Sequence, residues 1–75
     1  MNEKPGVLVR AECLRYFQDN PYSMEDIEGL RLRIGRNSED IGAAIEYLSK
    51  IGMLKKHSAG ESSFYTYVFP SESIV

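Results

Sequence analysis

A stripe of apolar residues between positions 38 and 51 constrains the fold of this chain more than any other sequence feature. Its members recur at helical spacing: Ile41, Ala44, Ile45, Leu48 and Ile51. Asn37 or Ser38 is expected to cap the start, since a short polar side chain can accept one of the first unpaired amide hydrogens. Gly52 closes the segment, because glycine readily adopts the left-handed conformation that follows many helices. We therefore predict a helix over about residues 38–51.

A first helix is predicted over about residues 7–18, where apolar residues again lie near helical spacing. Asp19-Asn20-Pro21 ends it, because a proline disfavours the helical conformation of the residue before it. This helix contains Cys13, the single cysteine of the chain. One cysteine excludes an internal disulfide and a multi-cysteine zinc cluster, and we interpret Cys13 as a small core residue rather than a redox sensor.

A second helix is predicted over about residues 23–34. Ser23 is expected to be its N-cap, and the carboxylates of Glu25 and Asp26 then complement the positive end of the helix dipole. Gly35 supplies the left-handed residue that ends the helix. The pattern therefore predicts two adjacent capped helices, 23–34 and 38–51, separated by a short turn.

A β-hairpin is predicted after the third helix, with strands over about 53–57 and 64–69. The polar segment 58–63 contains a glycine and is expected to be the loop between them. Residues 1–5 and 71–75 are expected to be frayed. The predicted fold class is α+β: one domain of three helices followed by a two-stranded hairpin.

Length and composition exclude several classes of protein. The chain has 75 residues, of which 43% are hydrophobic and 27% charged, which is ordinary for a soluble globular domain. No apolar run approaches the roughly 20 residues that cross a bilayer, and the first residues lack the apolar part of a signal peptide, so we expect a cytoplasmic location. A lone histidine, a lone cysteine and the lack of a glycine-rich phosphate loop predict no metal, no cofactor and no enzymatic activity.

The charges are unevenly distributed, although the formal net charge is only −2. Acidic residues dominate residues 1–30, whereas residues 31–56 carry six basic side chains against three acidic ones. The basic residues of that segment are Arg31, Arg33, Arg36, Lys50, Lys55 and Lys56. A partner rich in phosphate is therefore expected to bind residues 31–56.

The order of these elements resembles the winged helix-turn-helix family, most closely the MarR-like and related small regulators of bacteria and archaea. The segments that carry the resemblance are 22–27, 34–41 and 44–56. In that family the pattern Leu-x-x-x-Gly-hydrophobic-Leu joins the recognition helix to the wing, and residues 48–54 match it. One difference is that the second helix, 23–34, is predicted to be about one turn longer than in the commonest version.

The resemblance implies a transcriptional regulator that binds duplex DNA, with the third helix in the major groove and the hairpin near phosphates. The DNA-binding residues that it implies, by phosphate or base contact, are Arg36, Asn37, Ser38, Glu39, Gly42, Ala43, Glu46, Lys50, Lys55, Lys56 and His57. Glu39 and Glu46 are unusual on such a face: they can accept hydrogen bonds from cytosine, but they also repel phosphate. Ordinary solvated surface charge is the alternative interpretation of each basic residue.

Two protein-binding alternatives remain open. The acidic third-helix face, with small Gly42 and Ala43, also suits a protein interaction or assembly module. The predicted strand 64–69 is apolar on both faces, and helix one, a second copy of the chain or stacked bases can cover the face that the hairpin leaves open. A homodimer is therefore a further hypothesis.

Overall fold

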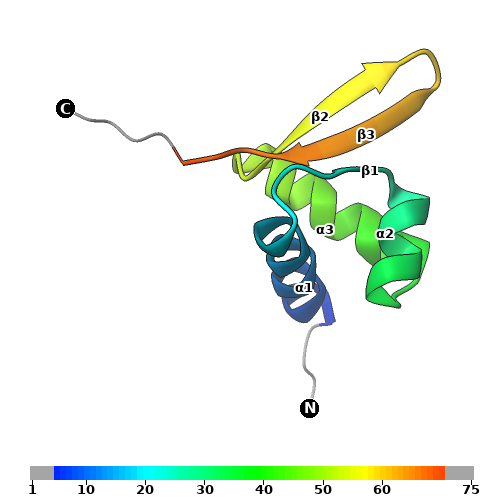
Figure 1. Ribbon diagram of the computed structural model, residues 1–75. Coiled ribbons are helices and arrows are strands. Elements are labelled where there is room, and N and C mark those ends of the chain that lie inside the picture. Colours follow the sequence, from blue (N-terminus) through cyan, green and yellow to red (C-terminus); the bar gives the residue numbers. More distant parts are fainter. Residues whose placement is uncertain (1–4, 71–75) are drawn as a thin grey trace.

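The computed structural model of the protein describes residues 5–70 and consists of three helices and a three-stranded antiparallel sheet (Figure 1). In chain order the elements are α1 (Pro5–Asp19), β1 (Met24–Glu25), α2 (Ile27–Ile34), α3 (Ser38–Lys50), β2 (Leu54–Ala59) and β3 (Ser62–Tyr67). The strand order is β1-β3-β2. The α+β prediction with three helices is thus confirmed, and the sheet has one strand more than the predicted hairpin. The predictions for residues 1–4 and 71–75 lie outside the described residues.

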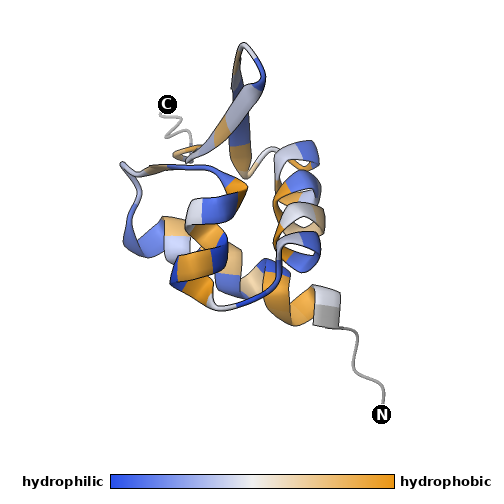
Figure 2. Ribbon diagram, turned by 90° about the vertical axis from the view of Figure 1, so that its right-hand side faces the viewer, coloured by the Kyte–Doolittle hydropathy of each residue, from blue (hydrophilic) through white to orange (hydrophobic). Residues whose placement is uncertain are grey.

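The core lies where the three helices meet the inner face of the sheet. Figure 2 shows that each of the three helices contains both hydrophobic and hydrophilic residues. The buried apolar side chains are Val9, Cys13, Phe17, Leu30, Ile41, Ala44, Ile45, Leu48, Leu54 and Tyr65. Most of the predicted third-helix stripe is therefore core, but Ile51 lies past the end of α3 and is half exposed. Within the described residues, no helix is long and apolar enough to cross a membrane.

Helix α1 begins at Pro5, two residues before the predicted start. Proline is well suited to the first turn of a helix, because its fixed φ is close to helical and its missing amide hydrogen is not needed there. Residue 5, which belongs to the segment expected to be frayed, is thus the first residue of α1. The interpretation of Cys13 as a core residue is confirmed, since its side chain is fully buried.

The start of the second helix differs from the prediction. Ser23 is not its N-cap: Met24 and Glu25 are extended and pair with β3, and α2 begins only at Ile27. Asp26 is the cap, and its Oδ1 accepts a hydrogen bond of 2.8 Å from the Gly29 amide. Helix α2 has eight residues, so the extra turn inferred from the sequence does not exist.

The turn between α2 and α3 follows the predicted signals. Gly35 has a left-handed backbone with φ of 83°, which L-residues with a side chain adopt at a cost. Asn37 is the N-cap of α3, and its Oδ1 accepts a 2.8 Å hydrogen bond from the Asp40 amide. The end of α3 falls at Lys50, one residue before the predicted boundary.

Strands β2 and β3 form a hairpin that extends away from the helices (Figure 1). The strands are longer at the turn than predicted, because residues 58 and 59 pair with 63 and 62 and leave only Gly60 and Glu61 to connect them. Gly60 has a φ of 63°, the kind of conformation that a two-residue hairpin turn requires. At the ends of the hairpin away from the turn, the strands are shorter than predicted: β2 begins at Leu54 instead of residue 53, and β3 ends at Tyr67 instead of residue 69.

Candidate functional site

The outward face of α3 carries the side chains that the sequence predicted for contact with a partner. Glu39, Ala43 and Glu46 are exposed on this helix, and Lys50 is exposed at its last residue. Gly42 is partly covered, by the Ile27 side chain at the start of α2. The structure therefore brings these five predicted residues onto one helix, with acidic and basic side chains both facing solvent.

The hairpin distributes its predicted residues over two faces. Lys56 pairs in register with Tyr65, whose side chain is buried against the core, so Lys56 lies on the face that α3 also borders. Lys55 and His57 lie on the opposite face, because side chains alternate along a strand. His57 is held there by a 2.9 Å hydrogen bond between its Nε2 and Thr66 Oγ1. These three hairpin residues therefore cannot all contact one partner surface from the same side.

Arg36, predicted to contact phosphate, is engaged by α1. Its Nε and Nη2 each donate a 2.8 Å hydrogen bond to Glu12, one to each carboxylate oxygen. These hydrogen bonds lower the pKa of Glu12, because they favour the charged carboxylate. Asn37, next in sequence, is committed to capping α3. The start of α3 is therefore less open to a ligand than the sequence pattern implied.

The other arginines of the basic segment also have acidic partners. Arg31 forms an ion pair of 3.0 Å with Glu28, and Arg33 one of 3.4 Å with Glu25. By contrast, the three lysines of this segment form no ion pair with any residue between 5 and 70. These lysines are Lys50, Lys55 and Lys56. The free positive charge of the segment is thus concentrated at the end of α3 and on β2.

A cavity of about 390 Å³ lies between α3, the start of α2 and the inner face of the hairpin. The residues that line it are Ile27, Gly42, Glu46, Ser49, Lys50, Lys56 and Tyr65. Four of these residues were predicted from the sequence to contact a partner, whereas Ile27, Ser49 and Tyr65 join them only because three elements converge in space. Cavities of this size with a few polar groups on an apolar lining are typical small-ligand sites.

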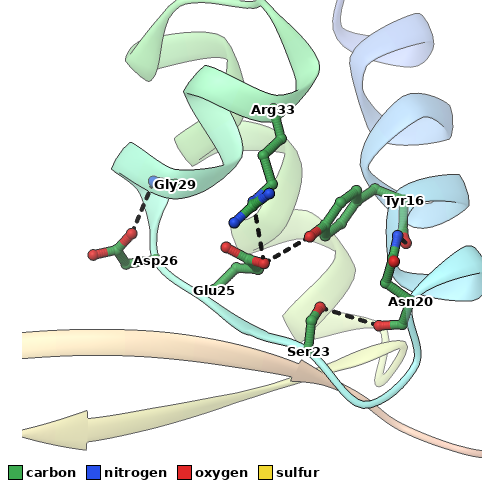
Figure 3. Close-up of polar contacts among 7 residues, drawn as sticks. All are labelled: Tyr16, Asn20, Ser23, Glu25, Asp26, Gly29 and Arg33. Carbon is green, nitrogen blue, oxygen red and sulfur yellow. Dashed lines mark hydrogen bonds and ion pairs between the residues drawn. The ribbon is translucent and has the colours of Figure 1, made fainter.

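A polar cluster that no sequence pattern predicted surrounds Glu25 (Figure 3). Glu25 is buried, and its Oε2 accepts a 2.6 Å hydrogen bond from the Tyr16 hydroxyl while Arg33 Nε lies 3.4 Å away. Burial, and then the hydrogen bond to Glu25, raise the pKa of Tyr16. Because these three residues come from β1, α1 and α2, the cluster ties together the elements that support α3.

The outer face of the sheet remains uncovered within residues 5–70. Met24, Val68 and Phe69 are exposed there or at its edge, and Tyr22 packs its ring 5.4 Å from that of Phe69. The last strand was predicted to be apolar on both faces. On its inner face Tyr65 is buried, whereas on its outer face Val68 is exposed.

Comparison with known proteins identified no relative: no family model, curated protein or solved structure matches this chain.

Proposed function

We propose that this protein is a winged helix-turn-helix domain that binds duplex DNA, with α3 in the major groove and the β2–β3 hairpin as its wing. The observation that carries the proposal is the arrangement of α2, a short turn and α3 beside a hairpin that projects past the helices (Figure 1). In helix-turn-helix proteins the second helix of the pair enters the major groove, and neighbouring elements contact the backbone. The outward face of α3 and the inner side of the hairpin supply these two surfaces here.

The free lysines support a mode of binding dominated by phosphate. Lys50, Lys55 and Lys56 are exposed and unpaired among residues 5–70, so they are available to replace the counterions that surround DNA. Such contacts give affinity and orientation without reading sequence. Glu39 and Glu46 are the side chains of α3 able to accept a hydrogen bond from cytosine, and they reduce affinity for neighbouring phosphates. The proposed function is therefore a regulator with moderate, strongly salt-dependent affinity.

A titration of fluorescently labelled duplex DNA at several salt concentrations tests this proposal. Each neutralised phosphate contributes about −0.9 to the slope of log K against log salt, so Lys50 and Lys56, which border the same cavity, give a slope of about −1.8. Lys50→Gln and Lys56→Gln are each expected to bring the slope about 0.9 closer to zero. Arg15→Gln is the matched control, because it removes an exposed charge of α1 that the proposal does not place against DNA. Absence of binding at low salt would refute the proposal.

A protein-binding module is the second candidate, and one observation favours it. Glu39 and Glu46 form no ion pair with residues 5–70, and the helix between them exposes the small Ala43. A basic partner can therefore approach α3 closely and pair with both acids. If this is the function, Gly42→Arg disrupts a complex recovered from cell extract, and the lysine variants leave that complex intact.

A further inference from the structure

The cavity between α3, α2 and the hairpin contains polar groups of both signs that the fold itself does not use. Glu46, Lys50 and Lys56 line it, and none of them forms an ion pair with a residue between 5 and 70. Glu46 and Lys50 are four residues apart on one helix, a spacing at which such side chains often pair. Because they do not, one carboxylate and two ammonium groups remain available at the same cavity.

One hydroxyl of the residues that line the cavity is buried and unpaired. Ser49 also lines the cavity, and its Oγ is inaccessible to solvent without a hydrogen-bond partner among the described residues. Buried polar atoms usually have a partner, because leaving one unpaired is destabilising. Because this Oγ is closed to solvent, it is also closed to a molecule in the cavity, and the polar contacts that remain available are those of Glu46, Lys50 and Lys56.

The floor of the cavity is apolar and is opened by a glycine. Ile27 and the buried Tyr65 contribute apolar surface, and Gly42 also lines the cavity but has no side chain. A Cβ at Gly42 would lie 3.6 Å from Ile27 Cδ1, which is an ordinary contact. The packing of α3 on α2 thus does not require glycine, and its effect in this structure is to leave space in the cavity.

We propose that this cavity binds a small zwitterion with an apolar side chain, an α-amino acid such as leucine. Glu46 accepts hydrogen bonds from the ammonium group, Lys50 and Lys56 donate to the carboxylate, and the side chain contacts Ile27 and Tyr65. The three charges of the lining are complementary to the two charges of the ligand, and its apolar remainder matches the floor. This site goes beyond DNA binding, since none of these contacts involves nucleic acid.

Titration of ¹⁵N-labelled protein with L-leucine, followed by NMR, tests the proposal. We expect saturable shifts of the amides of Gly42, Glu46 and Lys56, with a Kd on the order of 1 mM for so small a ligand. Two analogues separate the charges: 4-methylpentanoate lacks the ammonium group, and 3-methylbutylamine lacks the carboxylate. Each is expected to bind at least about tenfold more weakly than leucine, because one charge-assisted contact is lost.

Variants assign the contacts to residues. Glu46→Gln is expected to weaken leucine binding about tenfold and to leave 4-methylpentanoate binding unchanged, since that analogue has no ammonium group. Glu39→Gln is the matched control: it removes an exposed acid of the same helix that does not line the cavity, and it should leave leucine binding unchanged. Gly42→Leu fills the cavity and should abolish binding.

Three results would overturn the inference. They are the absence of saturable shifts at the cavity up to the solubility limit of leucine, equal binding of leucine and 4-methylpentanoate, and an equal loss in Glu46→Gln and Glu39→Gln. The titration contains no DNA, so a failure to bind DNA refutes the proposed function without touching this result, and a failure to bind leucine leaves the DNA proposal standing.

Discussion

Gly42 and Gly29 are both glycines inside helices, and the structure predicts that replacing each by alanine changes stability in opposite directions. At Gly42 the new Cβ would make an ordinary 3.6 Å contact with Ile27. Alanine is favoured over glycine in a helix interior by about 0.8–1.0 kcal/mol. We expect Gly42→Ala to raise the free energy of unfolding by about 1 kcal/mol, which corresponds to an increase in Tm of about 4–8 °C for a domain of this size.

At Gly29 the same change meets the cluster around Glu25. A Cβ there would lie 2.8 Å from Glu25 Oε1 and 3.2 Å from Asp26 Oδ1. The Glu25 carboxylate cannot move away freely, because it is buried and accepts the 2.6 Å hydrogen bond from Tyr16. The Asp26 carboxylate is the N-cap of the same helix. We expect Gly29→Ala to lower the free energy of unfolding by about 1 kcal/mol despite the better helix propensity.

Thermal and urea unfolding followed by circular dichroism measure both variants against the unmodified protein. The comparison is informative because the chemical change is identical and only the surroundings differ. If Gly29→Ala stabilises the protein as much as Gly42→Ala does, the contacts of Gly29 are not tight and the description of the Glu25 cluster is wrong. If Gly42→Ala destabilises, the α2–α3 packing requires glycine after all.

Three further perturbations follow from the buried and paired side chains. Tyr16→Phe removes the hydroxyl that donates to Glu25, and it should lower the free energy of unfolding in urea by about 1.5–2 kcal/mol. Tyr22→Phe, at an 88% exposed residue, is the control and should have no measurable effect. Equal effects of the two variants would contradict the hydrogen bond between Tyr16 and Glu25. Burial raises the pKa of the Cys13 thiol from 9.0 to about 11, so between these pH values the folded state retains a proton that the unfolded chain loses. The free energy of unfolding should therefore fall by on the order of 2 kcal/mol as the pH rises from 9 to about 11. The fall should be smaller in Cys13→Ala, which has no thiol. Under the DNA proposal, Glu12→Gln releases Arg36 to contact a phosphate, and the slope of log K against log salt should become more negative by about 0.9. An unchanged slope would show that Arg36 does not reach phosphate.

The helices were largely predictable because their signals are local. Asn37 as a cap, Gly35 as a left-handed terminator and the stripe from Ile41 to Leu48 each act within a few residues along the chain. Helix propensity, capping and burial all favour the same boundaries for α3, and so its prediction was accurate to one residue.

The second helix was mispredicted because a long-range interaction competes with a local one. Ser23 has the residue type of a cap, but pairing of Met24 and Glu25 with β3 keeps this segment extended, and Asp26 then caps the helix instead. The partner of Met24 is Thr66, which no local pattern identifies. The ion pairs of Arg33 and Arg36 with Glu25 and Glu12 were missed for the same reason. The exposed residues of α3 could be predicted from the helical periodicity of its apolar residues. The cavity beside them could not, because its lining residues come from segments that are distant in sequence.

Strand β1 also determines when the domain can be completed during synthesis. Its pairing of Met24 with Thr66 joins residues 42 positions apart in sequence (66 − 24 = 42), so the helices can form as they leave the ribosome but the sheet cannot close until β3 has followed them. Until then β1 has no strand to pair with, and Glu25 lacks the neighbour, Tyr65, that it faces in the finished sheet. A chain that stops before residue 62 therefore has an incomplete core, because it lacks β3 and the buried Tyr65.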